Sequence, residues 1–221
     1  MNSTLIIQSL ISGVMMGSVY ALLGVGFSLT WGVMKVINVA HATFGLLAAF
    51  FAYTALQAYG VDPLISLVVS APLLFLIGCT LYHLLIVRIT SAKAVIVSSM
   101  ILTFGIAIIL ENLMLLLWGA DPRLFTTSYT SKVIIIGPFY FQYPPVIGFL
   151  MSIVGVTLLH LFLKKTYLGK AVRAAWQQPD ASQLCGINLK RISAITFGLA
   201  VSTAGAGGLG MGLLYSFEPH S

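Results

Sequence analysis

One acidic residue of this sequence lies inside a long apolar run. Glu111 is followed directly by Asn112, and neither has a charged neighbour within the run. Inside hydrocarbon a carboxylate costs a few kcal/mol unless it is paired, solvated or protonated, so such an acid is a candidate functional group. The alternative is a carboxyl group that is hydrogen-bonded between helices. No series of acids and histidines accompanies Glu111, which argues against a proton relay.

A second polar group interrupts the mostly apolar stretch 32–42, where Lys35, Asn38 and His41 occur. This pattern favours a break in the helix over a water-filled loop, because non-helical backbone at membrane depth must be buried in protein or line a cavity. Asn38 can cap a following helix, which would place His41 three residues later on the same face. Two interpretations stay open: a cap with a hydrogen-bonded histidine, or a gate at the cytoplasmic end of a cavity.

Sequence motifs for catalysis are missing. The sequence has no P-loop, no H-E-x-x-H motif and no nucleophile elbow. Cys79 and Cys185 lie in an apolar and a polar segment respectively, so neither a disulfide framework nor a metal-ligand spacing is visible. We therefore expect no enzyme activity, no catalytic residue, no metal and no cofactor bound by this chain.

The composition places these residues in a membrane protein. Of the 221 residues, 59% are hydrophobic and 7% are charged, and the mean hydropathy is +1.03. Soluble proteins carry about 25% charged residues, and disordered chains need low hydropathy and high charge. The net charge of +6 forms no basic face along a soluble domain, so no nucleic acid is expected as a partner.

Six runs are long enough to cross the roughly 30 Å of hydrocarbon, which takes about 20 apolar residues. We predict an all-α fold, a polytopic membrane helical bundle that forms a single domain over residues 1–221. The runs are 5–31, 43–59, 64–87, 94–118, 146–163 and 192–217.

The basic residues predict the orientation of these spans. The segment 164–191 holds six of the 11 Lys and Arg residues and one acid, Asp180, so it should be cytoplasmic. Alternation then places Lys35, Arg88 and Lys93 inside, and the N-terminus and the loop 119–145 outside. A docking surface for an acidic partner or for anionic lipid headgroups is compatible with this explanation of the charge.

The cytoplasmic segment itself is predicted to be ordered. Residues 169–178 form a short helix, Pro179 and Asp180 suit the first turn of a second one, and Gly186 suits its end. Two helices exceed what a connection requires. We interpret this loop as a surface for another protein.

Four stretches carry a resemblance to a known family. They are Gly13-x3-Gly17-x2-Tyr20-Ala21-Leu22 with Gly24 and Gly32; Asn38-x-Ala40-His41; Thr103-x-Gly105 with Leu110-x-Asn112 and Gly119; and Gly169-x-Ala171-x-Arg173-Ala174 with Gly186-Ile187-Asn188, Phe197 and Ala204-Gly205-x2-Gly208. In them the chain resembles, over essentially its whole length, the membrane-spanning permease subunits of ABC importers of the branched-chain amino acid type. It departs from the family at Ala42, where a glycine is usual, at Thr43, and in the bulk of Trp176 and the stiffness of Pro179.

The resemblance implies roles for several residues. The ATPase-coupling surface would comprise Gly169, Ala171, Arg173, Ala174 and Gly186. The translocation pathway or its gate would include Asn38 and His41, and we place the intramembrane acid Glu111 there as well.

The resemblance also implies partners. ATP would be used by separate ATP-binding cassette ATPase subunits docked on the loop 164–191. The other partners would be a second homologous permease subunit, an extracytoplasmic solute-binding protein and the lipid bilayer. The chain would cross the bacterial cytoplasmic (inner) membrane several times. Family members continue past the equivalent of Pro219, so we expect this chain to be C-terminally short.

The predicted function is uptake of branched-chain or similar amino acids. A second hypothesis, from the same class, is a permease for another small polar solute, such as urea, an amide or a sugar, because related systems share the scaffold. A secondary carrier or channel would have only Glu111 and the histidines for ion coupling and would leave the ordered loop unexplained. A membrane scaffold that does not transport is the fourth hypothesis.

Overall fold

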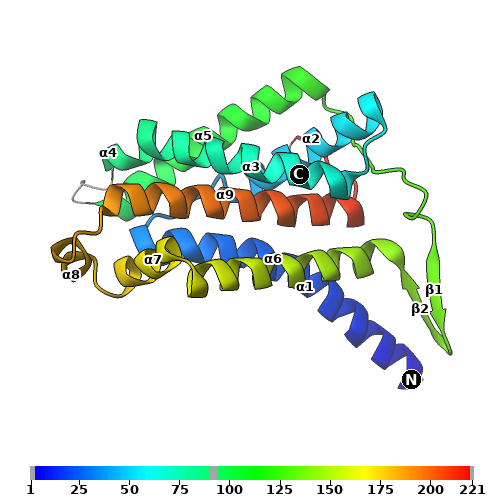
Figure 1. The fold of residues 1–221 in the computed structure, drawn as a ribbon. Helices are drawn as coiled ribbons and strands as arrows, with labels where there is room; N and C mark the ends of the chain where they lie inside the picture. The colour runs from blue at the N-terminus through cyan, green and yellow to red at the C-terminus, as the bar shows by residue number, and fades with distance from the viewer. Residues whose placement is uncertain (1–2, 90–93, 220–221) are drawn as a thin grey trace.

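Six long helices run along one common direction in the computed structural model, which describes residues 3–89 and 94–219 (Figure 1). All six are long and apolar enough to cross a membrane, which confirms the predicted bundle. Lys93 lies outside the described residues. The helices are α1 (Ser3–Met34), α2 (His41–Tyr59), α3 (Pro63–Leu81), which continues through the π-helical turn η1 (Tyr82–Ile86) into α4 (Val87–Ile89), α5 (Val95–Trp118), α6 (Tyr143–Lys165) and α9 (Leu189–Leu214).

Two short helices and one hairpin complete the chain. Helices α7 (Tyr167–Gln177) and α8 (Pro179–Leu184) lie at one end of the bundle, and the antiparallel strands β1 (Val133–Ile136) and β2 (Phe139–Gln142) lie at the other (Figure 1). The prediction contained no hairpin in the loop 119–145. The turn between β1 and β2 is formed by Gly137, with φ of 58°, and Pro138. Helix α6 also begins earlier than predicted, because prolines suit the first turn of a helix.

Helix α9 occupies the centre of the bundle and packs against α1, α2, α3 and α6. Its many small residues permit these close approaches, because small side chains let helix backbones come near each other in membranes. A Cβ atom added to Gly198 would lie 2.8 Å from a backbone oxygen of α3. At Gly208 an added Cβ atom would overlap the backbone of Gly45 in α2. Dispersion contacts around these glycines therefore hold the bundle together.

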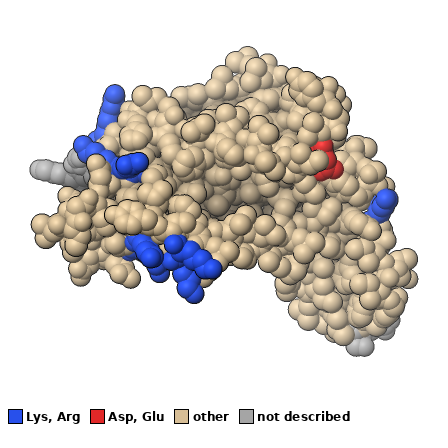
Figure 2. Space-filling view, in the orientation of Figure 1, with Lys and Arg blue, Asp and Glu red and all other residues tan. Residues whose placement is uncertain are grey.

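Most of the basic residues lie at one end of the bundle. Figure 2 shows that Lys and Arg side chains gather at the end that carries α7 and α8. Lys35, Arg88 and six residues of the segment 164–191 supply the charge there. The arrangement agrees with the predicted orientation, in which this end faces the cytoplasm.

At the opposite end, the loop after α5 is tied to the rest of the bundle. The backbone of Arg123 pairs with that of Phe217 through hydrogen bonds of 2.8 and 2.9 Å. The Tyr129 hydroxyl donates to Oδ1 of Asp62, the residue that caps α3, at 3.1 Å. Burial raises the pKa of Tyr129 to about 12, so the phenol keeps the proton that it donates.

Candidate functional site

The segment between α1 and α2 is a buried, non-helical stretch of backbone. Lys35 begins it with φ of 54°, and Val36, Asn38 and Ala40 are fully buried. Side chains of α5 satisfy its backbone, since Ser99 Oγ accepts from Ile37 N–H at 3.1 Å. Thr103 Oγ1 accepts from Val39 N–H at 3.0 Å. This agrees with the expected helix break inside protein.

The predicted cap by Asn38 is wrong. Helix α2 begins at His41, its N-cap residue is Ala40, and no side chain caps it. Asn38 contributes only its backbone carbonyl, which accepts from His41 N–H at 3.2 Å. Its amide is 1% exposed, and neither the Oδ1 nor the Nδ2 atom has a partner within residues 3–89 and 94–219. A buried amide without partners costs about 1–3 kcal/mol, so the Asn38 side chain does not stabilise the fold through hydrogen bonds.

His41 joins α2 to α1 and lies close to α9. Its Nε2 atom is 3.0 Å from the carbonyl oxygen of Leu23, which assigns the proton to Nε2 and leaves Nδ1 as an acceptor. Nδ1 is buried and has no partner in the described part of the chain. Gly26 of α1 lies close to both α2 and α9. A Cβ atom added to it would be 3.0 Å from Cε1 of His41 in α2 and would overlap the hydroxyl of Thr203 in α9.

Glu111 lies away from these two residues along α5. It follows Thr103 by eight residues, or roughly 12 Å along the helix axis. Its side chain is half-buried and makes no hydrogen bond or ion pair among the residues described. The structure thus brings Asn38 and His41 to one region of the core and leaves Glu111 outside it.

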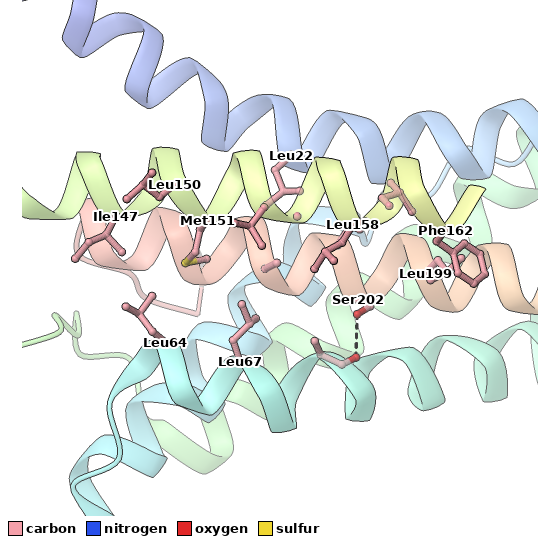
Figure 3. Close-up of a pocket in the computed structure, with 16 residues that line it drawn as sticks. Leu22, Leu64, Leu67, Ile147, Leu150, Met151, Leu158, Phe162, Leu199 and Ser202 are labelled. Atoms are coloured by element: carbon pink, nitrogen blue, oxygen red, sulfur yellow. Dashed lines mark hydrogen bonds between the residues drawn. The ribbon is translucent and has the colours of Figure 1, made fainter. Parts of the chain in front are cut away.

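An apolar groove of about 620 Å³ runs between α3, α6 and α9 (Figure 3). Leu22 of α1 and Thr203 of α9 also line it. The Ser202 hydroxyl donates to the carbonyl oxygen of Ala71 at 3.0 Å and so ties α9 to α3 within the groove. Thr203 and His41 both lie beside Gly26, so this side of the groove is close to His41. The leucine-rich walls come from Leu64, Leu67, Leu150, Leu158 and Leu199.

Helix α7 is amphipathic and rests on the membrane helices. Its N-cap Thr166 accepts from Gly169 N–H at 2.9 Å. Ala171, Val172 and Ala175 pack with Ile192 of α9. Gly169 lies against the end of α6, where an added Cβ atom would overlap the Phe162 carbonyl oxygen. Gly169 and Ala171 therefore support the loop from inside.

The other predicted coupling residues face outward. Arg173 is exposed, and Ala174 lines a depression of about 380 Å³ between α7 and α8. Gly186 is exposed, and its φ of 81° ends α8 as predicted. The remaining residues that line the depression are Gln177, Gln178, Ala181, Ser182, Cys185 and Ile187.

Helices α7 and α8 together form a cap on this end of the bundle. Two apolar residues of the cap were not among the predicted site residues. Leu184 of α8 is 91% exposed, and Trp176 of α7 is 52% exposed. The Trp176 ring lies on the backbone of α1, since an added Cβ atom at Gly32 would be 3.0–3.3 Å from three of its ring atoms. A signal was present, because both are large apolar residues in a loop that also holds six basic residues.

Comparisons with known proteins relate this arrangement to transport. The family model described as the permease component of the branched-chain amino acid transport system matches residues 9–220. The high-affinity branched-chain amino acid transport system permease protein BraD of Pseudomonas aeruginosa is 25% identical over 95% of this chain and 71% of its own length. The probable branched-chain amino acid transport permease protein LivH of Methanocaldococcus jannaschii is 26% identical, over 85% of this chain and 61% of its own.

A shorter match concerns a different solute. The nucleoside ABC transporter permease protein NupB of Lactococcus lactis is 32% identical over 34% of this chain and 21% of its own length. No solved structure matches the chain.

Proposed function

We propose, since the chain belongs to the family of permease components of branched-chain amino acid transport systems, that it is one membrane subunit of an ATP-driven importer for branched-chain or similar amino acids. It is a multi-pass membrane protein, and we place it in the bacterial cytoplasmic (inner) membrane. Separate ATP-binding cassette subunits would hydrolyse the ATP, so this chain would need no cofactor of its own. A solute-binding protein would deliver the amino acid at the end that carries the hairpin.

The cytoplasmic cap of α7 and α8 is the observation that carries this proposal. Its buried face is anchored on α1, α6 and α9, whereas Arg173, Trp176 and Leu184 remain exposed. An ordered surface with exposed apolar groups beside a depression is typical of a protein interface. The ATPase subunits are the partner that the family implies for this end.

The groove between α3, α6 and α9 supports an amino acid with an apolar side chain as the solute. Its volume of about 620 Å³ lies within the 300–1,000 Å³ typical of ligand pockets. Its leucine-rich walls suit an aliphatic side chain better than urea or a sugar. We propose the groove as one wall of the translocation pathway, with His41 and Asn38 behind it as the polar groups that respond to the solute.

Trp176 offers a physical link between the cap and this pathway. Its ring contacts Gly32, three residues before Lys35 begins the buried segment that holds Asn38. A shift of α7 on the membrane helices would therefore move the inner end of α1. Through that segment the shift would reach His41 and Asn38.

Reversing the charge at Arg173 tests the docking surface. We expect Arg173→Glu to weaken binding of the partner ATPase about tenfold, or about 1.4 kcal/mol, because a carboxylate would replace the cation in the interface. The measurement is co-purification of the membrane protein with titrated ATPase subunit. Lys132→Glu is the matched control, since it makes the same charge change on an exposed residue at the opposite end. Undiminished ATPase binding by Arg173→Glu would contradict the assignment of α7 to the docking surface.

Asn38→Leu separates a pathway role from a structural one. The amide has no partner among the described residues, so an apolar side chain of similar size should leave the free energy of unfolding unchanged or raise it by about 1 kcal/mol. Uptake should fall about tenfold if the amide contacts the zwitterionic solute during transport. Unfolding in detergent and uptake in vesicles supplied with binding protein and ATPase measure the two effects. Unchanged uptake would show that the Asn38 amide has no role in transport.

A further inference from the structure

A further depression, the inner notch, lies where α3 with η1, α6, α7 and α9 meet at the basic end of the bundle. It has a volume of about 480 Å³. Phe162 and Leu199 line both the inner notch and the larger groove, and Figure 3 shows them at one end of that groove. Arg191 of α9 and His83 of η1 add a cationic and a polar side chain to walls that are otherwise apolar.

The inner notch reaches from the helix ends into the membrane. Arg191 lies in the first turn of α9, and Leu199 follows it by eight residues, or roughly 12 Å along the helix axis. On α6, Phe162 precedes the last helical residue, Lys165, by three residues. The apolar wall therefore lies at hydrocarbon depth, whereas Arg191 lies at the level of the headgroups. A soluble protein could contact the rim of the notch but not this wall.

Arg191 has no anionic partner within residues 3–89 and 94–219. Its side chain is exposed and makes no hydrogen bond or ion pair there. The first turn of α9 also holds Lys190 and contains no acid. Because the N-terminus of a helix carries a partial positive charge, two basic residues at this position are unfavourable unless an anion lies close to them. The rim of the inner notch is thus complementary to a negatively charged group.

The charge of the notch also distinguishes between two kinds of ligand. A zwitterionic amino acid would need an anionic partner for its ammonium group, and none of the described residues that line the notch is acidic. A phospholipid with a net negative charge needs donors for its phosphate and apolar surface for an acyl chain. The guanidinium of Arg191 matches a phosphate, and the His83 ring can supply a second donor. Basic pockets between membrane helices on the cytoplasmic side are typical sites for anionic lipid headgroups.

We propose that the inner notch binds one anionic phospholipid of the cytoplasmic leaflet. The phosphate lies on Arg191, with His83 as the second donor, and one acyl chain extends along Phe75 and Leu199 into the membrane. Since Leu168 of α7 also lines the notch, the bound lipid contacts the cap as well as the membrane helices. The lipid thereby joins α7 to α3 and α9.

Native mass spectrometry of the full chain tests the proposal, because it counts the lipids that stay bound when the protein leaves a detergent micelle. Phosphatidylglycerol is the anionic probe, and phosphatidylcholine with the same acyl chains is the probe without net charge. We expect the first phosphatidylglycerol to bind about tenfold more tightly than the first phosphatidylcholine, and Arg191→Gln to abolish this difference. Arg88→Gln is the matched control and should preserve it, since Arg88 is an exposed arginine at the same end that does not line the notch.

A third probe separates a lipid site from a site for a small anion. Glycerol 3-phosphate carries the phosphate without acyl chains, so we expect it to bind at least a hundredfold more weakly than phosphatidylglycerol. Equal binding of these two probes would overturn the proposal, and so would equal binding of the two phospholipids. An equal loss in Arg88→Gln and Arg191→Gln would also overturn it, because the attraction would then belong to the basic end as a whole. The lipid comparison needs no variant, ATPase or solute, so its outcome is independent of the proposed transport function.

Discussion

Gly208→Leu is expected to remove the folded protein from membranes. Even a Cβ atom at Gly208 would overlap the backbone of Gly45, and neither backbone can move without separating α2 from α9. Overpacking of a core usually costs about 1–3 kcal/mol, and a clash between two backbones in the centre of a bundle should reach at least the upper end of that range. With a total stability of about 5–15 kcal/mol, a loss of this size lowers the folded fraction strongly. Folded yield after extraction, measured by size-exclusion chromatography, shows the effect.

Gly24→Leu is the matched control for this substitution. Gly24 lies on the exposed side of α1, and no atom lies within 4 Å of the position of an added Cβ atom. The control should accumulate as the unchanged protein does. If Gly208→Leu gave the same folded yield as Gly24→Leu, the close crossing of α2 and α9 would not be a feature of the folded state.

Gly32→Val is expected to reduce uptake about thirtyfold while ATPase binding persists. The added methyl groups would enter the Trp176 ring, since even a Cβ atom lies 3.0 Å from it, and would push α7 off the inner end of α1. A displacement that costs about 2 kcal/mol in the coupled state corresponds to this factor in rate. Uptake in vesicles and ATPase co-purification, measured on the same preparation, separate coupling from docking.

The control for this prediction lies on the same helix. Gly24→Val makes the same change where the added atoms meet open space, so uptake should stay near that of the unchanged protein. Loss of ATPase binding by Gly32→Val would show that the substitution disrupts the docking surface itself. Normal uptake would refute the link through Trp176.

The membrane spans and the cytoplasmic helices could be predicted because their signals are local. The bilayer fixes the length of a span, and Pro179 and Gly186 mark the bounds of α8 in the sequence as they do in the structure. The cap by Asn38 could not be judged locally. Ser99 and Thr103, more than 60 residues away, bind the backbone on either side of it. The chain therefore stays non-helical through Ala40 and starts α2 only at His41.

The candidate site depended on contacts that a pattern does not contain. Gly169 and Ala171 carry the family pattern, yet they are buried, whereas the exposed Leu184 was not predicted. Sequence similarity does not separate a residue that supports a surface from one that forms it.

The place of α9 in the chain has a consequence for biosynthesis. This helix fills the centre of the bundle, yet the ribosome makes it after the other five spans. Spans enter the membrane in sequence and associate afterwards. Until Leu189–Leu214 emerges, α1, α2, α3 and α6 lack their shared partner, and the glycine surfaces of Gly45 and Gly78 stay open to lipid. The nascent chain is therefore exposed to degradation and mispairing until α9 is inserted.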